Sequence, residues 1–349
     1  MTDAHIDISH ALRIICSGES LDRQTAFEVM RDVMTGAVTE YQIAGLLAAL
    51  QARGETPEEV AGFAEAMRSH ARSVELGDLG GKAVVDTCGT GGDGSGTFNV
   101  STTAAFVVAG AGVAVAKHGN RAASSKTGSA DLLEALGAKI AASPDEVASS
   151  VRDVGFGFML APEYHPAMRH VMPVRRGLGV PTVFNILGPL CNPAGVKRQV
   201  IGVRNMRIAR LMASVLDTLG SERVLIVTSA EGADELTLTG VNRVVDLDQA
   251  SGGTREYDLD PTELGFESIP LSDIRGGSAA ENAEITRGVL EGEPGPHRDT
   301  VLLNAAAGLI AAARAERFAD AVALAAEAID SGAAMAVLDR YVVADRVVA

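Results

Sequence analysis

The first 75 or so residues carry apolar positions at helical spacing, divided by short polar turns. Two of these runs begin with capping boxes, Thr39-x-x-Gln42 and Thr56-x-x-Glu59, whose side chains can satisfy the free N–H groups of a first helical turn. Two shorter helical segments precede them. The pattern therefore predicts a small N-terminal helical domain over residues 1–75.

Beyond this domain, short apolar runs alternate with helical segments, of which residues 144–154 have a capping box at Ser143-x-x-Glu146. Apolar strands that alternate with helices are typical of a mainly parallel sheet covered by helices. We therefore predict an α/β fold, with a large domain over 76–349 built on a mainly parallel central sheet. The small all-helical domain is expected to be completed by helices around 165–180. The expected strands span residues 83–86, 113–116, 156–160, 199–203, 224–229 and 254–260.

Composition and charge narrow the classes of function. The chain has 349 residues and a net charge of −15, which repels nucleic acid and anionic membranes. Only 4% of the residues are aromatic, so few side chains can stack on single-stranded bases. The apolar part of the longest uncharged stretch, Ala104–Ala116, has 13 residues, whereas a membrane helix needs roughly 20. We expect neither nucleic acid nor a membrane as a partner.

The cysteines and the N-terminal sequence indicate a compartment. Cys16, Cys88 and Cys191 lie far apart and are odd in number, which is typical of free thiols in a reducing environment. The sequence MTDAHIDISH lacks the apolar core of a secretory signal. We expect a cytoplasmic protein.

A glycine-rich loop is the first candidate site. Residues Cys88–Gly96 read CGTGGDGSG, between an expected strand and a helix that begins near Ser101. Glycines let an anion approach backbone N–H groups without a Cβ in the way, and a helix N-terminus favours negative charge. The hydroxyl and amide side chains of Thr97–Thr103 suit phosphate oxygens or a hydrated metal ion. We interpret the segment as an anion-binding loop, with a ligand-free glycine turn as the alternative.

The same loop formally satisfies the dinucleotide fingerprint G-x-G-x-x-G at Gly89, Gly91 and Gly94. That fingerprint expects an acidic residue about 20 positions on, for the ribose hydroxyls. The corresponding stretch, VAVAKHGN, contains Lys117 and His118 and no acid. Binding of a nicotinamide dinucleotide is therefore disfavoured.

A second polar loop follows the expected strand 113–116. Between Lys117 and Asp131 the chain is rich in Gly and Ser and carries three cations, with no acidic residue before the last position. Runs of charge commonly form solvated faces. Because this one follows a buried strand in an acidic protein, a second anion-binding loop is favoured.

An acidic pair and an arginine pair complete the candidates. Asp234 and Glu235 follow the expected strand 224–229, and adjacent carboxylates suit Mg²⁺, which takes oxygen ligands and substrate phosphates. Arg175 and Arg176 offer guanidinium groups, which bind carboxylates through two parallel hydrogen bonds. Taken in isolation, each of these pairs is better explained as ordinary charged residues in a surface loop or helix than as a binding site.

Five motifs, in order, resemble the anthranilate phosphoribosyltransferase family. They are GTGGDGSGTFNVST, KHGNRAASSKTGSADLLEALG, HPAMRHVMPVR, FNILGPLCNP and ADELT. The resemblance extends from the N-terminal helices to the C-terminus, and the first two motifs are long and specific. It implies a Mg²⁺-dependent enzyme of tryptophan biosynthesis that joins anthranilate to phosphoribosyl pyrophosphate (PRPP) and releases pyrophosphate. It also implies a homodimer with a fold related to the pyrimidine nucleoside phosphorylases.

The resemblance assigns roles to residues of both polar loops. It implies anthranilate contacts at Gly89, Asn120 and Arg175, and a metal shell of Ser101, Asp234 and Glu235, with two Mg²⁺ ions expected. The residues that it assigns to PRPP are Gly89, Gly92, Asp93, Thr97, Asn99, Val100, Ser101, Thr102, Lys117, His118, Gly119, Asn120, Arg121, Ala122, Ala123, Ser124, Ser125 and Ser129.

One departure and two alternatives accompany this interpretation. Where the family usually has Leu-Gly-x-Arg-Thr, this chain has Val180-Pro181 before the threonine, so the local backbone between the two domains is expected to differ. One alternative is a pyrimidine nucleoside phosphorylase of the same fold, and the other is a non-catalytic relative that binds nucleic acid. Arg175 and Asn120 suit a carboxylate-bearing aromatic amine better than a pyrimidine. No covalent nucleophile is expected, because Cys88 has no evident base beside it.

Overall fold

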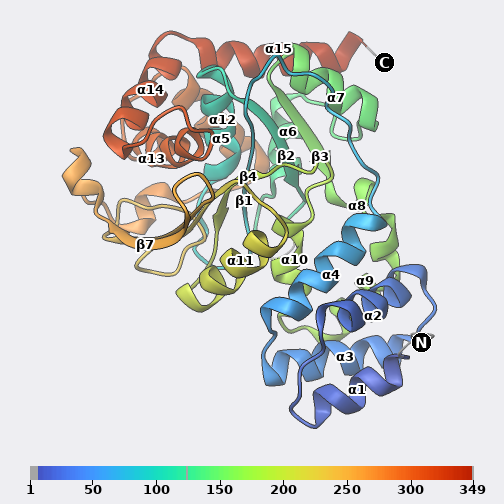
Figure 1. Cartoon of the computed structure of the whole chain (residues 1–349). Helices are drawn as coiled ribbons and strands as arrows, with labels where there is room; N and C mark the ends of the chain where they lie inside the picture. Colours follow the sequence, from blue (N-terminus) through green and yellow to red (C-terminus); the bar gives the residue numbers. More distant parts are fainter. Residues whose placement is uncertain (1–6, 123–124, 348–349) are drawn as a thin grey trace.

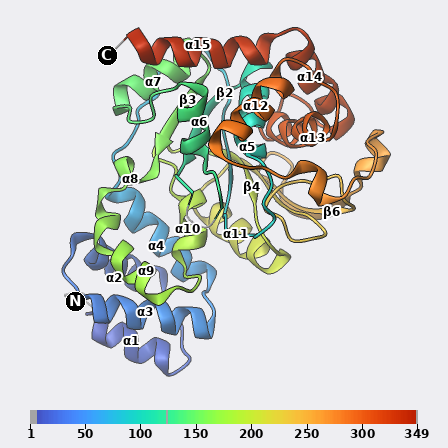
Figure 2. The same ribbon diagram turned by 180° about the vertical axis from the view of Figure 1, so that it is seen from behind.

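The computed structural model describes residues 7–122 and 125–347, with a helical unit at the lower end of Figure 1 and a sheet covered by helices above it. The chain later returns to the helical unit, where a 3₁₀ turn (Pro166–His170) contacts α2 and helix α9 (Met172–Leu178) contacts α3. Figure 2 shows the same arrangement from behind. The four N-terminal helices are α1 (Ile8–Cys16), α2 (Arg23–Thr35), α3 (Glu40–Arg53) and α4 (Pro57–Ser69).

The capping boxes predicted for α3 and α4 are confirmed. The Gln42 side chain accepts from the backbone N–H of Thr39 at 2.9 Å, and the Glu59 side chain accepts from that of Thr56 at 3.0 Å. The Glu59 carboxylate is fully buried and also accepts from the backbone N–H of Leu21 at 2.9 Å. The Glu59 side chain therefore caps the N-terminus of α4 and also binds the backbone of the turn before α2.

Within the part of the chain that the structure describes, seven strands form the central sheet in the order β3-β2-β1-β4-β5-β6-β7. The first five run parallel, and β6 and β7 are antiparallel to their neighbours. The expected α/β class is confirmed, and each expected strand forms; β6 is an additional strand that the sequence pattern missed. The strands are β1 (Val84–Gly89), β2 (Ala114–Gly119), β3 (Phe156–Leu160), β4 (Arg198–Gly202), β5 (Arg223–Thr228), β6 (Asn242–Asp248) and β7 (Gly253–Leu259).

Helices cover both faces of the sheet. On one face, α5 packs against α13 and α15, and the Phe106 ring of α5 stacks on Phe156 of β3 with centroids 4.4 Å apart. The helices of this unit are α5 (Val100–Gly110), α6 (Ser129–Leu136), α7 (Pro144–Asp153), α8 (Ala161–Tyr164), α10 (Phe184–Leu190), α11 (Met206–Thr218), α12 (Ala279–Leu290), α13 (Pro296–Ala311), α14 (Phe318–Asp330) and α15 (Ala333–Val347). Two further 3₁₀ turns span Pro261–Leu264 and Leu271–Ile274.

The opposite face of the sheet shares its hydrophobic core with the helical unit. Ile201 of β4 and Ile226 of β5 belong to the same buried cluster as Leu46 of α3 and Phe63 of α4. Helix α11 packs against α4, β5 and β6 and so lies within this shared core. The packing fixes the helical unit against the sheet.

Within the described residues no single helix is both long enough and apolar enough to cross a bilayer. The pair Phe318–Asp330 and Ala333–Ala344 passes only when taken together, and it bends by 58° at its break.

Candidate active site

The predicted polar loops meet at the carboxyl edge of the parallel strands. One follows β1, one follows β2, and the segment with the acidic pair follows β5. Because β2 and β4 lie on opposite sides of β1, the chain changes winding direction between β1 and β4. Ligands of open α/β sheets bind in the crevice at such a switch point.

Two glycines let Asp234 lie directly over this switch point. Gly89 and Gly202 are paired residues at the ends of β1 and β4. A Cβ on Gly202 would overlap the backbone carbonyl of Asp234, and a Cβ on Gly89 would overlap its carboxylate. Asp234 Oδ2 accepts from the backbone N–H of Gly91 at 2.6 Å, and Asp93 Oδ2 accepts from the backbone N–H of Asp234 at 3.2 Å. The acidic segment is thereby joined to the glycine-rich loop.

The second acid of the pair lies at the N-terminus of α5. Glu235 Oε1 accepts from the backbone N–H of Ser101 at 3.1 Å. Lys117, which is 2% exposed, reaches the same helix end, with Nζ 3.4 Å from Ser101 Oγ, and also donates to the Thr87 carbonyl. An acid, a buried amine and a helix N-terminus therefore meet at Ser101.

The ionisation of these groups is shifted by burial. Burial raises the pKa of Asp234 to about 7, and the charge of Asp93 adds to the effect. Burial followed by repulsion from Asp234 raises the pKa of Glu235 to about 8. Burial lowers the pKa of Lys117. Perturbed pKa values in a crevice are typical of functional sites.

The acidic pair fits a magnesium ion bound together with phosphate. Among residues 7–122 and 125–347, no three His, Cys, Asp or Glu side chains form a complete metal cage. Mg²⁺ in phosphate-binding sites needs only one or two carboxylates and completes its shell with water and phosphate oxygens. The two buried carboxylates, whose ionisation is suppressed, supply such a partial donor set, and Glu235 also accepts from the backbone N–H of Ser101.

The second loop is folded by its own hydrogen bonds. Ser129 Oγ donates to the Asn120 carbonyl at 3.1 Å, and the backbone N–H groups of Ala122 and Gly128 both donate to Asp131 Oδ2 at 2.9 Å. Ala123 and Ser124, which the family resemblance assigns to PRPP, lie outside the described residues.

The side chain of Arg121, a predicted ligand in this loop, is already engaged with acids. Its guanidinium pairs with Asp131 at 3.1 Å and with Glu134 Oε1 at 2.8 Å. Lys126 and Ser125 are exposed. The strand expected to end at residue 116 continues to Gly119, so Lys117 lies on β2 and not in the loop. Of the three cations predicted for the loop, Lys117 is the one whose charge acts on Glu235 of the acidic pair.

Sequence reasoning missed the residues that hold the two loops together. Asp86, fully buried on β1, accepts from Asn192 Nδ2 at 2.8 Å and from the backbone N–H of His118 at 3.2 Å. Asn282 of α12 donates to Asn99 Oδ1 at 2.8 Å. Two features of the sequence could have pointed to these residues: Asn192 lies within the motif FNILGPLCNP, and the Gly276-Gly277 pair lies just before α12.

His118 and Arg175 both contact helix α10. His118 Nδ1 lies 3.3 Å from the Gly188 carbonyl, and burial lowers its pKa to about 3, so the ring is neutral. The Arg175 guanidinium lies over the Phe184 ring at 5.6 Å and donates to Asn185 Oδ1 at 3.5 Å. The side-chain contacts of Arg175 within the described residues are with Met172, Phe184 and Asn185, none of them acidic, and burial lowers its pKa.

Two further sequence expectations concern Val180-Pro181 and Cys88. The exposed Val180-Pro181 pair lies in the turn between α9 and α10, and Gly179 before it adopts a φ of +63°. Burial raises the pKa of the Cys88 thiol well above its usual range, and neighbouring carboxylates raise it further. A reactive thiolate is therefore disfavoured at Cys88.

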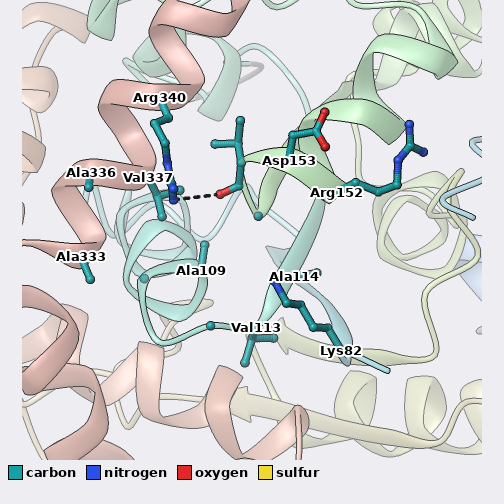
Figure 3. Close-up of a pocket in the computed structure, with 14 residues that line it drawn as sticks. Lys82, Ala109, Val113, Ala114, Arg152, Asp153, Ala333, Ala336, Val337 and Arg340 are labelled. Atoms are coloured by element: carbon teal, nitrogen blue, oxygen red, sulfur yellow. Dashed lines mark hydrogen bonds between the residues drawn. The ribbon is translucent and has the colours of Figure 1, made fainter. Parts of the chain in front are cut away.

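A cavity of about 350 Å³ lies elsewhere, at the amino-terminal edge of β1 and β2, between α5, α7 and α15 (Figure 3). Arg340 of α15 donates to the Val154 carbonyl across it at 3.4 Å. None of the residues predicted to bind substrate or metal is among those that line it. The candidate active site is therefore the carboxyl edge.

Comparison with protein families defines the class. Residues 81–335 match the model of the glycosyl transferase family, a/b domain, and residues 9–71 match that of the glycosyl transferase family, helical bundle domain. The two matches correspond to the sheet-based and the helical parts of the fold.

Individual relatives narrow the class further. An anthranilate phosphoribosyltransferase of Thermomicrobium roseum is 51% identical over 336 residues, which are 95% of either chain. The crystal structure of the Thermus thermophilus anthranilate phosphoribosyltransferase superposes with a TM-score of 0.90 at 49% identity, covering 96% of this chain and 99% of that one. The Saccharomyces cerevisiae enzyme in complex with PRPP and Mg gives a TM-score of 0.87 at 29% identity, over 97% and 98% of the two chains. The chain belongs to the anthranilate phosphoribosyltransferase family.

Proposed function

We propose that the chain transfers the 5-phosphoribosyl group of PRPP to the amine of anthranilate, releasing pyrophosphate, in tryptophan biosynthesis. The observation that carries this proposal is the meeting of two glycine-rich and serine-rich loops with the Asp234–Glu235 pair at the β1/β4 switch point. The family relatives named for this activity support it over nearly the whole chain.

PRPP is assigned to the two loops. The backbone N–H groups of the loop after β1 and the N-terminus of α5 favour its phosphate oxygens. Lys117, near the end of β2, places its Nζ beside Ser101 Oγ at the same helix end. Fission of the bond between the ribose C1 and the diphosphate oxygen puts positive charge on the sugar and negative charge on the leaving group. Lys117 and the backbone donors stabilise that negative charge without covalent chemistry.

Anthranilate is assigned to the region between the second loop and α10. Arg175, which has no acidic partner among the described residues, can bind its carboxylate through two hydrogen bonds. Asn120 and Gly89 are assigned to the same substrate from the family resemblance. The aromatic amine is neutral at pH 7, so it needs placement near C1 more than a strong base.

Magnesium is assigned to Asp234, Glu235 and Ser101. The suppressed ionisation of the two acids is relieved when a cation is bound near them. When bound, Mg²⁺ neutralises negative charge on the diphosphate. We also propose that two ions bind. Titration of PRPP-bound protein with Mn²⁺, followed by electron paramagnetic resonance, measures the number of bound ions.

A homodimer and a cytoplasmic location complete the proposal. Tyr41 of α3 has a side chain 91% exposed, and aromatic residues of this kind are enriched at protein interfaces. Cys16, Cys88 and Cys191 are all free, as expected in a reducing compartment. Light scattering on the purified protein tests the dimer, which requires twice the mass of the chain.

The direct test of activity is the loss of anthranilate fluorescence on addition of PRPP and Mg²⁺. We expect a loss that requires all three components and releases pyrophosphate. The alternatives have their own assays. Phosphorolysis of thymidine or uridine without turnover of anthranilate would identify a nucleoside phosphorylase. Tight DNA binding that weakens steeply with salt, without transferase activity, would identify a nucleic-acid-binding relative.

A further inference from the structure

The segment before α12 is hydrogen-bonded to both polar loops. The backbone N–H of Phe98 donates to the Ile274 carbonyl at 3.1 Å, and that of Gly276 donates to the Gly96 carbonyl at 2.9 Å. On the other side, Thr127 Oγ1 donates to the Gly277 carbonyl at 2.8 Å. Residues 274–278 therefore join the loop after β1 to the loop after β2, although they are distant from both in sequence.

Asn282, on the first turn of α12, reaches from this segment to Asn99. Its side chain is buried, with the residue 2% exposed. Asn282 Oδ1 accepts from the backbone N–H of Gly277 at 2.7 Å, and Asn282 Nδ2 donates to Asn99 Oδ1 at 2.8 Å. Asn99 Nδ2 in turn donates to the Thr127 carbonyl at 3.2 Å. The amides thus form a chain of hydrogen bonds from Gly277 to Thr127.

The direction of this chain is fixed at both ends. A backbone N–H can only donate, so Gly277 requires the oxygen of Asn282 to face it and leaves the Asn282 nitrogen for Asn99. A backbone carbonyl can only accept, so Thr127 requires the nitrogen of Asn99. Asn99 Nδ2 has a second N–H, which the chain does not use. Asn99 therefore presents a donor, and not an acceptor, beside the anion loops.

Close packing keeps the partners in register. A Cβ on Gly276 would lie 2.6 Å from Phe98 Cα and 2.8 Å from Asn282 Oδ1, so a side chain there would separate the segment from the loop. One turn along α12, Thr286 Oγ1 meets Thr103 Oγ1 of α5 at 2.9 Å. Thr286 thus contributes a buried polar contact between the same two helices without touching Asn99.

We infer that Asn282 is a positioning residue for PRPP, which sets the amide of Asn99 so that its free N–H faces an oxygen of the bound donor substrate. The inference rests on the proposed function, in which Asn99 belongs to the PRPP site. An Asn99 amide turned by 180° would instead place its carbonyl oxygen against PRPP, where it would repel the phosphate and ribose oxygens.

The test is the variant N282D, compared with T286V as a control. Aspartate at 282 still accepts from Gly277 but cannot donate to Asn99 Oδ1, so the Asn99 amide is driven to turn. We expect the KM for PRPP to rise by about tenfold or more, since one hydrogen bond to a charged ligand is exchanged for a repulsion. The KM for anthranilate should stay unchanged. T286V removes a polar contact of the same helix and should leave both KM values unchanged.

A double-mutant cycle separates positioning from general loss of structure. If Asn282 acts through Asn99, the pair N282D and N99A together should raise the KM for PRPP no further than N99A alone. Additive effects of the two changes, or an equal rise in T286V, would overturn the inference. N282A, which adds no charge, replaces N282D in the cycle if N282D has lost its thermal transition.

The failure of this inference is distinguishable from failure of the proposed function. Calorimetric binding of PRPP with Mg²⁺ to wild type and N282D needs no anthranilate. Weaker PRPP binding by N282D supports the positioning role even if wild type does not consume anthranilate. Equal PRPP affinity of wild type and N282D would refute the role even if the transferase activity is confirmed.

Discussion

At Asp234 and Glu235 the chain keeps two carboxylates where neither ionises easily. Their pKa values rise to about 7 and about 8 because both are buried and each faces another acid. The backbone N–H of Gly91 donates to the Asp234 carboxylate, and that of Ser101 donates to the Glu235 carboxylate. A bound cation offsets the repulsion, so the pair is unfavourable for the empty chain and favourable for a metal complex.

Removing either charge tests this role. Asp234→Asn and Glu235→Gln should lower kcat/KM for PRPP by roughly 10- to 100-fold and raise the Mg²⁺ concentration needed for half-maximal rate, because a metal ligand is weakened. The thermal midpoint should not fall, since a strained carboxylate is removed. Glu231→Gln, an exposed acid of the same loop, is the matched control. Unchanged Mg²⁺ dependence in both variants would exclude the pair from the metal shell.

A substitution of Arg175 tests the proposed binding of anthranilate. Arg175→Ala should raise the KM for anthranilate by roughly 10- to 100-fold, because a charged hydrogen bond to the carboxylate is lost. The KM for PRPP should change little. Arg176→Ala, the exposed neighbour, serves as control under the same steady-state assay. A variant that instead loses PRPP affinity and keeps that for anthranilate would place Arg175 elsewhere.

Sequence reasoning at the residue scale found the loops but not their supports. Gly89, Lys117 and Asp234 stand out because glycine runs, isolated cations and acid pairs carry recognisable chemistry. Asn282 and Asn192 act through amide hydrogen bonds to distant segments, and a single asparagine has no local pattern that reveals its partner. Their positions became evident only from the folded chain.

At the scale of elements, the glycines at the strand ends decide how closely the loops approach. Gly202 of β4 lies so near the Asp234 carbonyl that a methyl group would overlap it. The loop after β5 must therefore move if this position gains a side chain. The position of the acidic pair depends on β4 as much as on its own loop.

Gly202→Ala tests this dependence. It should lower the free energy of unfolding by about 1–3 kcal/mol, as overpacking does, and reduce PRPP use together with it. Gly177→Ala on α9 is the control, since a Cβ there meets no atom within 4 Å. Chemical unfolding and steady-state kinetics of the two variants provide the comparison. Wild-type stability and activity in Gly202→Ala would show that the close approach is not required.

Strand prediction succeeded for β1 to β5 and β7 and failed for β6. Buried parallel strands read as apolar runs, which are visible in sequence. In β6, Asp246 is fully buried and is paired with Arg255 of β7 at 2.8 Å and with Arg223 of β5 at 3.6 Å. The partners of the buried Asp246 lie on neighbouring strands. Without them, the charged residues within 242–248 interrupt the apolar pattern that would predict a strand.

At the scale of the molecule, the helical unit and the sheet share one core, and buried histidines lie near the junction. The rings of His118 and His165 are 5.1 Å apart, and His165 Nε2 lies 3.0 Å from the Cys191 carbonyl. Burial lowers the pKa of His165 to about 4. The sequence indicated two structural parts, but not this continuous packing, because each apolar helix face can satisfy its pattern against any partner.

The junction makes stability depend on pH in a defined direction. Between pH 6.5 and 4 the unfolded chain protonates His165, whereas the folded chain does not, so stability falls as pH falls. Between pH 6.5 and 5, wild type should lose about 1.5 kcal/mol more than His165→Gln, measured by urea unfolding. His10→Gln, at an exposed position on α1, should behave as wild type. Identical pH slopes for wild type and His165→Gln would contradict the buried neutral ring.

The central claim is that three segments from β1, β2 and β5 surround one leaving group. Its most direct test is the crystal structure of the protein soaked with PRPP and Mg²⁺. We predict diphosphate density between the loop after β1 and the loop after β2, beside Lys117, with metal density at Asp234 and Glu235. Diphosphate bound away from these loops, or an acidic pair without metal while the diphosphate is present, would contradict the account.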